Sequence, residues 1–300
     1  MINQDKNLFT GVLLQNEPLA RYTSWRVGGP ADQLYIPAGL EDLSGFLQTL
    51  SPDEPVYFIG LGSNLLVRDG GVRGTVIVMH NVLTQLNMDA GLVYVEAGVT
   101  CGKLAKFTAK EAKQGAEFFA GIPGTMGGAL AMNAGCYGSE TWDVVSKVMT
   151  IDRQGQLNIR DRQSFEVSYR HVSMPVAGEW FVGAWLNLAI GNATVSAQKI
   201  KDLLATRLST QPLNLPSAGS TFRNPAGDYA ARLIEACGLK GFVIGGAQVS
   251  EKHANFIVNI GAANGLDVEL LIKHMHDVVL EKQGIALQQE VKVIGEYDSK

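Results

Sequence analysis

The segment Gly60–Leu65, which reads GLGSNL, has the residues to bind an anion through its backbone. It follows the apolar run Val56–Ile59, and small residues after a strand can turn several N–H groups into one concavity that suits a phosphate. Two common phosphate motifs are absent: Leu65 stands where GxGxxG needs its third glycine, and no lysine completes a GxxxxGK[ST] loop. Taken alone, the segment is more typical of a turn that ends a strand.

A second glycine-rich segment, Ala120–Gly138, raises the case for a nucleotide ligand. It has six glycines in 19 residues and almost no charge, whereas a structural turn needs only one or two glycines. A long uncharged backbone of this kind can approach a flat ring and a diphosphate closely. A tightly packed cluster of turns stays open as the alternative.

Polar side chains that could act on a substrate lie further along the chain. Ser168–Arg170 (SYR) carries one cation, in what we expect to be a strand with one exposed side chain. Gly219 permits a sharp backbone that presents the Ser220 hydroxyl, and Asn224 offers amide donors and acceptors. Glu290 lies in a run typical of a solvated edge strand. Since no histidine is near Ser220 in the sequence, a hydrolytic triad is not indicated.

Metal binding and disulfides are not predicted. Cys101, Cys136 and Cys237 are an odd, widely spaced set without a CxxC pair. His274 and His276 diverge on a helix, so they are poor partners for one metal ion.

These segments must be positioned by strands and helices that follow each other closely. We expect strands at Gln33–Ile36, Val56–Ile59, Val72–Met79, Leu92–Ala97, Lys147–Ile151, Leu157–Ile159, Phe181–Ala189 and Leu287–Ile294. We expect helices at Leu40–Leu50, Gly102–Lys113 with Thr100 as its cap, Val195–Leu208 and Tyr229–Cys237. The stripe Val268, Leu271, Ile272, Met275, Val278 and Val279 predicts a last helix that begins at Asp267 and ends at Gly284. Phe118–Gly138 is expected to be a long loop.

The whole chain is predicted to be an α+β protein, with parts at 1–81, 82–195 and 196–300. It is 46% hydrophobic and 18% charged, as expected of a globular protein. A net charge of -4 argues against a nucleic-acid surface. Met1–Thr10 lacks the pattern of a signal peptide, and no stretch of about 20 apolar residues could span a membrane. We therefore expect a cytoplasmic protein.

Taken together, the segments resemble the UDP-N-acetylenolpyruvoylglucosamine reductase family of peptidoglycan precursor synthesis, in its shorter variety. The motifs that carry the resemblance are Thr23–Asp32 (TSWRVGGPAD), Gly60–Gly71 (GLGSNLLVRDGG), Ala120–Gly138, Ser168–Arg170, Pro216–Pro225, His253–Asn259 (HANFIVN) and Glu290–Gly295 (EVKVIG). They lie in the expected order over nearly the whole chain. One departure is Arg223, which stands where lysine is frequent, so its grip on a phosphate can differ in geometry.

The resemblance implies a fold, a cofactor and a set of site residues. The fold is a two-part FAD-binding domain of the vanillyl-alcohol oxidase/p-cresol methylhydroxylase type, over 1–81 and 82–195, with a C-terminal α+β substrate-binding domain. FAD is expected to be bound non-covalently, and NADPH to be the co-substrate. The residues expected to hold FAD are Gly60, Leu61, Gly62, Ser63, Asn64, Leu65, Gly121, Ile122, Pro123, Gly124, Thr125, Gly127, Gly128, Asn133, Ala134 and Gly135. Tyr169, Arg223 and Asn224 are expected to hold the substrate.

The reaction that the resemblance implies is the reduction of UDP-N-acetylglucosamine enolpyruvate to UDP-N-acetylmuramate. NADPH reduces FAD, hydride passes to the enol ether, and negative charge develops on the neighbouring carbon and its carboxylate. Arg170 is expected to face that charge, Glu290 to hydrogen-bond it or to act as an acid if burial raises its pKa, and Ser220 to deliver the proton.

Two other functions stay open: a related FAD-dependent oxidase, and a non-catalytic sugar-nucleotide-binding protein. The protein is expected to be a monomer that takes a UDP-sugar as its ligand.

Overall fold

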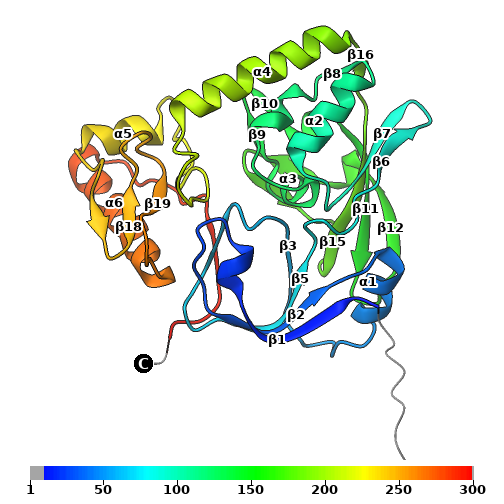
Figure 1. Cartoon of the computed structure of the whole chain (residues 1–300), viewed down its shortest axis with the longest axis horizontal. Coiled ribbons are helices and arrows are strands. Elements are labelled where there is room, and N and C mark those ends of the chain that lie inside the picture. The colour runs from blue at the N-terminus through cyan, green and yellow to red at the C-terminus, as the bar shows by residue number, and fades with distance from the viewer. Residues whose placement is uncertain (1–9, 299–300) are drawn as a thin grey trace, which may run out of the picture. The chain divides into compact units, whose positions relative to one another are not determined.

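The computed structural model describes residues 10–298 (Figure 1). Within this range the chain forms two compact units. The first contains the residues up to Leu14, Leu34–Gly60 and Thr75–Ala205, and the second contains Gln15–Gln33, Leu61–Gly74 and the chain from Thr206 on. The predicted division at residues 81 and 195 stays a prediction. The expectation about Met1–Thr10 lies, except for Thr10, outside the described residues.

The first unit contains a five-stranded antiparallel sheet in the order β12-β11-β15-β7-β6. Its strands are β12 (Leu157–Asp161), β11 (Val145–Asp152), β15 (Glu179–Leu186), β7 (Leu92–Glu96) and β6 (Leu86–Asp89). Four of the predicted strands are thereby confirmed, although the one predicted at Phe181–Ala189 ends at Leu186 and a separate short strand follows it.

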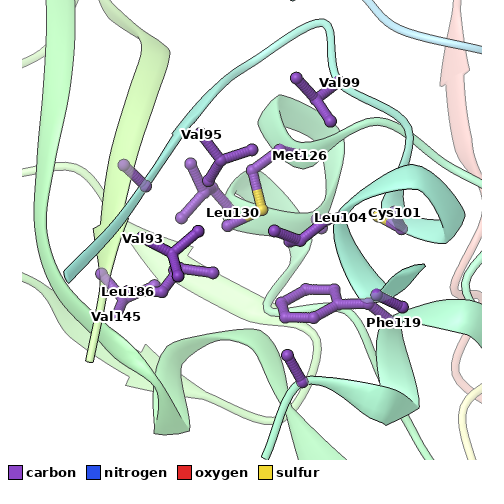
Figure 2. Packing of buried hydrophobic residues seen from close by; sticks show 14 of the residues in the cluster. Val93, Val95, Val99, Cys101, Leu104, Phe119, Met126, Leu130, Val145 and Leu186 are labelled. Atoms are coloured by element: carbon purple, nitrogen blue, oxygen red, sulfur yellow. The ribbon is translucent and has the colours of Figure 1, made fainter. Parts of the chain in front are cut away.

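Two helices, α2 (Cys101–Lys110) and α3 (Met126–Met132), pack against this sheet and bury its apolar face (Figures 1 and 2). Alternate residues of β7, Val93 and Val95, point into this core, because side chains on a strand alternate between its faces. Helix α2 contributes Leu104, and α3 contributes Met126 and Leu130 (Figure 2). This core is what holds the second glycine-rich segment in place.

A four-stranded sheet has the order β1-β2-β5-β3. Its strands are β1 (Val12–Pro18), β2 (Pro30–Ile36), β5 (Val72–Val78) and β3 (Val56–Ile59), of which β3 and β5 pair in parallel. The short helix α1 (Leu40–Leu47) buries Leu43, Phe46 and Leu47 in a core with Ile77 of β5. Since Val56–Ile59 is a strand as predicted, Gly60 stands at its carboxyl end.

The second unit is built around a three-stranded antiparallel sheet and two helices. The sheet consists of β17 (Val243–Ile244), β18 (Ala247–Val249) and β19 (Ile257–Asn259), and the helices are α5 (Ala230–Ala236) and α6 (Gly265–Gln283). Strand β20 (Lys292–Ile294) pairs in parallel with β4 (Leu65–Val67). This last pair brings the C-terminal motif beside the first glycine-rich segment.

Helix α6 confirms the predicted apolar stripe but corrects its start. Five of the six stripe residues are buried in the core of the second unit, and Val278 packs against that core. The N-cap is Asn264 rather than Asp267: the Asn264 side chain accepts from the Asp267 N–H at 2.8 Å, and Asp267 reaches back to the Asn264 N–H. This reciprocal pair is a capping box, in which the acidic residue stands at the third helical position. Gly284 ends the helix with φ +69° as predicted.

The segment Phe118–Gly138 is not the long loop that we expected. It folds into a 3-10 helix, η2 (Glu117–Gly121), helix α3 and a hairpin of β9 (Gly135–Cys136) with β10 (Ser139–Glu140). Glycine disfavours a helix interior by about 1 kcal/mol, but a Cβ on Gly127 would lie 3.0 Å from the Ala97 side chain, so a larger residue would need Ala97 to shift by a few tenths of an ångström. The expected strand Leu287–Ile294 is likewise shorter, because only Lys292–Ile294 pairs continuously.

The other described elements are short, except for one long helix. That helix, α4 (Ala193–Thr210), confirms the predicted Val195–Leu208 helix. The short ones are η1 (Leu19–Tyr22), β8 (Lys113–Gln114), η3 (Thr141–Asp143), η4 (Arg162–Ser164), β13 (Glu166–Ser168), β14 (His171–Ser173) and β16 (Ala189–Ile190). No helix within residues 10–298 has the length and apolar character to cross a membrane.

Candidate active site

The first glycine-rich segment presents backbone N–H groups that the protein leaves open. The N–H groups of Leu61, Gly62 and Ser63 donate to no acceptor among the described residues. Gly62 adopts φ +58°, and a Cβ there would lie 2.2 Å from the Tyr22 carbonyl oxygen, so only glycine fits. Consecutive N–H groups around a left-handed residue form a concavity for anions.

Ser24 fixes this segment from the Thr23–Asp32 motif. Its backbone N–H and its hydroxyl both donate to the Gly62 carbonyl oxygen, each at 3.2 Å. With the carbonyl held in this way, the neighbouring N–H groups are free to face a ligand. Sequence reasoning assigns Ser24 no role, although its motif is one of those that carry the family resemblance.

The two glycine-rich segments meet inside the first unit at Gly60 and Thr125. A Cβ on Gly60 would lie 2.3 Å from the Thr125 Oγ1, which is closer than real side chains approach. Thr125 precedes helix α3, whose Met126 and Gly127 N–H groups are taken by the carbonyls of Val99 and Ala97. Gly60, the first residue of one segment, therefore lies directly against Thr125 of the other.

The side chain of Asn133 makes hydrogen bonds within the protein that connect segments of the site. Its Nδ2 donates to Glu140 Oε2 at 2.7 Å and to the Ser168 carbonyl at 3.1 Å, while its Oδ1 accepts from the Trp142 N–H. Its backbone is left-handed, with φ +42°. The side chain therefore joins the end of α3 to the hairpin that carries Tyr169 and Arg170.

Tyr169 and Arg170 form a turn and not the strand that we expected. Strands β13 and β14 pair Ser168 with His171, so the two residues between them make a two-residue hairpin loop. Arg170 has φ +56°, an uncommon conformation for a side-chain-bearing residue. Its guanidinium donates to the Gly135 carbonyl at 2.9 Å and the Asn133 carbonyl at 3.4 Å, and lies 5.2 Å from the centre of the Tyr169 ring. The structure therefore brings Arg170 onto the second glycine-rich segment.

Backbone hydrogen bonds within the second unit join Glu290 to the residue after Ser220. The Glu290 N–H donates to the Thr221 carbonyl at 2.9 Å, and Arg223 N–H donates to the Gln288 carbonyl at 2.8 Å. Asn64 Nδ2 donates to the Glu290 carbonyl at 3.1 Å. A cofactor candidate and two catalytic candidates, up to 226 residues apart in sequence, thus share one small region.

Asn224 is partly used by the fold. Its Oδ1 accepts from the Ala230 N–H at 3.1 Å, at the start of α5. A substrate contact would therefore need the Asn224 Nδ2, which no described contact occupies. Arg170 lies in the first unit, and Ser220, Arg223, Asn224 and Glu290 lie in the second.

A buried asparagine that the sequence reasoning missed holds the Ser220 segment. Asn255 is 2% exposed, and its side chain makes hydrogen bonds to both backbone polar groups of Phe222. The available signal was a polar residue inside the apolar run Ala254–Val258. Next to it, burial lowers the pKa of the His253 imidazole. Across residues 10–298 no cluster of three His, Cys, Asp or Glu side chains could hold a metal ion.

Comparison with known proteins places the chain in a family. Residues 211–294 match the family model described as UDP-N-acetylenolpyruvoylglucosamine reductase, C-terminal domain, and residues 31–159 match an FAD binding domain. The expected fold is thereby confirmed as an FAD-binding domain of the vanillyl-alcohol oxidase/p-cresol methylhydroxylase type with a C-terminal α+β domain.

Relatives match over the full length of the chain. The UDP-N-acetylenolpyruvoylglucosamine reductase of Alkalilimnicola ehrlichii is 54% identical over 100% of both chains, and that of Methylococcus capsulatus is 55% identical over 95% of this chain and 94% of its own. The crystal structure of such a reductase from Thermus caldophilus has a TM-score of 0.81 and 31% identity, and it covers 95% of this chain and 99% of that one. The chain therefore belongs to the UDP-N-acetylenolpyruvoylglucosamine reductase family.

Proposed function

We propose that this protein is an NADPH-dependent FAD enzyme that reduces UDP-N-acetylglucosamine enolpyruvate to UDP-N-acetylmuramate in peptidoglycan precursor synthesis. The observation that carries the proposal is its match to reductases of this name along its whole length. We also propose that it acts in the cytoplasm as a monomer; gel filtration with light scattering tests the monomer directly.

The residues present fit the diphosphate of FAD. Leu61, Gly62 and Ser63 offer three consecutive N–H groups without an acceptor in the described part of the chain, and Gly62 is buried, so water satisfies its N–H poorly. A buried donor without a partner costs about 1–3 kcal/mol, which an anionic ligand at this place would offset. Leu61–Ser63 and Gly121–Gly135 are the residues proposed to hold FAD, which would supply the hydride for the substrate. No histidine in these segments offers a covalent attachment point, which supports non-covalent binding.

Arg170 is proposed to stabilise the negative charge that develops on the enolpyruvyl carboxylate. A guanidinium stays protonated and offers forked donors that match a carboxylate. The carbonyls of Gly135 and Asn133 fix its orientation before substrate arrives, so little reorganisation is needed.

Ser220 is proposed to give a proton to the carbon next to the carboxylate, and Glu290 to hydrogen-bond the same region. The two residues lie on neighbouring segments joined by the Glu290 N–H to Thr221 carbonyl bond. Tyr169, Arg223 and the free Nδ2 of Asn224 are the proposed substrate contacts. Arg223 is the residue proposed to bind the diphosphate of the UDP-sugar, because it is the cation nearest in sequence to Ser220.

Replacing Ser220 with alanine tests the assignment of the proton donor. The two half-reactions are followed separately by stopped-flow absorbance of the bound flavin. NADPH should bleach the flavin at the wild-type rate, and the return of absorbance with the enolpyruvyl substrate should slow by about 10²–10⁴-fold, as expected when a general acid is lost.

Ser217→Ala is the matched control, because it removes a hydroxyl from the same segment three positions earlier, and it should keep both rates. Wild-type rates in both half-reactions of the Ser220→Ala enzyme would refute the role of Ser220. A wild-type protein that is reoxidised only by oxygen would instead indicate an oxidase, and a colourless protein would indicate a binding protein.

A further inference from the structure

The segment that carries Ser220 has little regular structure of its own. Around it, strand-like pairing is limited to two isolated β-bridges, Ser217 with Val258 and Phe222 with Gln289. A hydroxyl that must deliver a proton to one carbon atom needs a fixed position, because a misplacement of about 1 Å can cost about 10²-fold in rate. The bonds that hold this segment are therefore relevant to the reaction.

Asn255 makes three of those bonds from one residue. Its carbonyl accepts from the Thr221 N–H at 2.8 Å, its Oδ1 accepts from the Phe222 N–H at 3.0 Å, and its Nδ2 donates to the Phe222 carbonyl at 2.8 Å. The paired bonds to Phe222 are those that a neighbouring strand would make. The side-chain amide thus replaces a strand at the point where the segment has none.

The same short segment also holds Glu290. The Thr221 carbonyl accepts from the Glu290 N–H at 2.9 Å, and the Glu290 carbonyl accepts from Asn64 Nδ2 at 3.1 Å. Asn255, Thr221 and Phe222 are 2%, 0% and 1% exposed, so water does not compete for these bonds. One chain of hydrogen bonds therefore runs from Asn255 through Thr221 and Glu290 to Asn64.

We propose that Asn255 is a positioning residue for Ser220 and Glu290, acting through the paired hydrogen bonds of its side chain to Phe222. The proposal rests on the proposed function for the identity of the reaction. It requires both ends of the amide: an oxygen that accepts from the Phe222 N–H, and an N–H that donates to the Phe222 carbonyl. A merely well-packed polar residue would not need both.

Asn255→Asp separates these requirements with almost no change of shape. A protonated carboxyl can still accept and donate as the amide does, but an ionised carboxylate turns an oxygen towards the Phe222 carbonyl and repels it. Because the site is buried, the pKa of the new carboxyl should rise above its usual value of about 3.9. The variant should therefore work at low pH and fail as the pH rises.

The assay follows both half-reactions of the holoenzyme across pH, with circular dichroism recorded at each point. In Asn255→Asp, reoxidation by the enolpyruvyl substrate should fall by about 10–100-fold as the new carboxyl ionises, while bleaching by NADPH keeps the wild-type profile. The wild-type enzyme run in parallel removes the contributions of His253 and Glu290 to the pH profile. Met275→Ala serves as a control that opens a cavity in the same hydrophobic core without removing a hydrogen bond of Phe222, and its two half-reactions should keep their wild-type ratio.

Equal loss of both half-reactions in Asn255→Asp, or a pH profile of reoxidation equal to that of wild type, would overturn the proposal. If the variant unfolds as its carboxyl ionises, native-state hydrogen exchange of the wild-type holoenzyme decides: the Thr221, Phe222 and Glu290 amides should exchange together and slowly. Fast exchange of the Phe222 amide alone would show that the paired hydrogen bonds between the Asn255 side chain and Phe222 do not exist. A wild-type enzyme that never reduces the enolpyruvyl substrate would refute the proposed function. The exchange measurement would still test the hydrogen bonds between Asn255 and Phe222.

Discussion

Replacing Gly60 with alanine tests the contact between the two glycine-rich segments. The new Cβ would lie 2.3 Å from Thr125 Oγ1 and 3.3 Å from the Thr125 Cβ and Cγ2, where ordinary contacts begin at 3.4 Å. The shortfall at the oxygen is thus about 1 Å, and overpacking of this kind costs about 1–3 kcal/mol. Gly60 does not have a positive φ, so the cost is steric and not a matter of backbone conformation.

The assay is urea unfolding of the apoprotein, followed by flavin content of the purified holoprotein. Gly45→Ala in helix α1 is the matched control, because nothing lies within 4 Å of its new Cβ. Alanine is the better helix former, so this variant should gain about 0.5–1 kcal/mol. Gly60→Ala should lose about 1–3 kcal/mol and retain less flavin.

The double variant Gly60→Ala/Thr125→Ala, measured together with the two single variants, gives a double-mutant cycle. Removing the Thr125 hydroxyl and Cγ2 should relieve the overlap and give a favourable coupling of at least about 0.5 kcal/mol between the two sites. Additive effects, or a gain of stability in Gly60→Ala alone, would refute the contact between Gly60 and Thr125.

Two further predictions concern the buried polar residues Thr221 and His253 of the second unit, with Thr150 of the first unit as a comparison. Thr221 Oγ1 is buried and has no hydrogen-bond partner in the described chain, so Thr221→Val should raise the free energy of unfolding by about 1 kcal/mol. Thr150→Val removes a 2.7 Å bond to Glu179 and should lower the free energy of unfolding by about 1–3 kcal/mol. Urea unfolding that gives the same sign for both variants would contradict this prediction. Burial lowers the pKa of His253, so its contribution to stability is fully present above the unfolded value of about 6.5 and is lost as the pH falls towards the lower folded value. Unfolding between about pH 7 and 5 should show this slope, and His253→Gln should flatten it; an unchanged slope in the variant would assign it to other groups.

Local patterns were enough to predict much of the secondary structure. Val56–Ile59 is a strand because four apolar residues stand between turn-forming segments, and α6 follows from its apolar stripe and Gly284. Helix α3 was missed because Gly127 and Gly128 look like helix breakers in isolation. What offsets their cost is the burial of Met126, Ala129 and Leu130 against distant parts of the core, which no local pattern encodes.

The site was predictable in its residue types and not in its connections. Six glycines in a short uncharged segment indicated a nucleotide, and the family resemblance supplied Arg170, Ser220 and Glu290. The sequence did not reveal that Asn133 binds Ser168, or that Asn255 binds Phe222 33 residues away. Such pairs depend on how the chain folds back on itself, so only the structure identifies them.

The proposed reduction of an enolpyruvyl UDP-sugar by NADPH is tested most directly in the absence of oxygen. The yellow holoprotein is bleached with stoichiometric NADPH and then mixed anaerobically with UDP-N-acetylglucosamine enolpyruvate. We expect the flavin absorbance to return without oxygen and mass spectrometry to identify UDP-N-acetylmuramate as the product. Absorbance that returns only when oxygen is admitted, with the UDP-sugar unchanged, would contradict the proposed function.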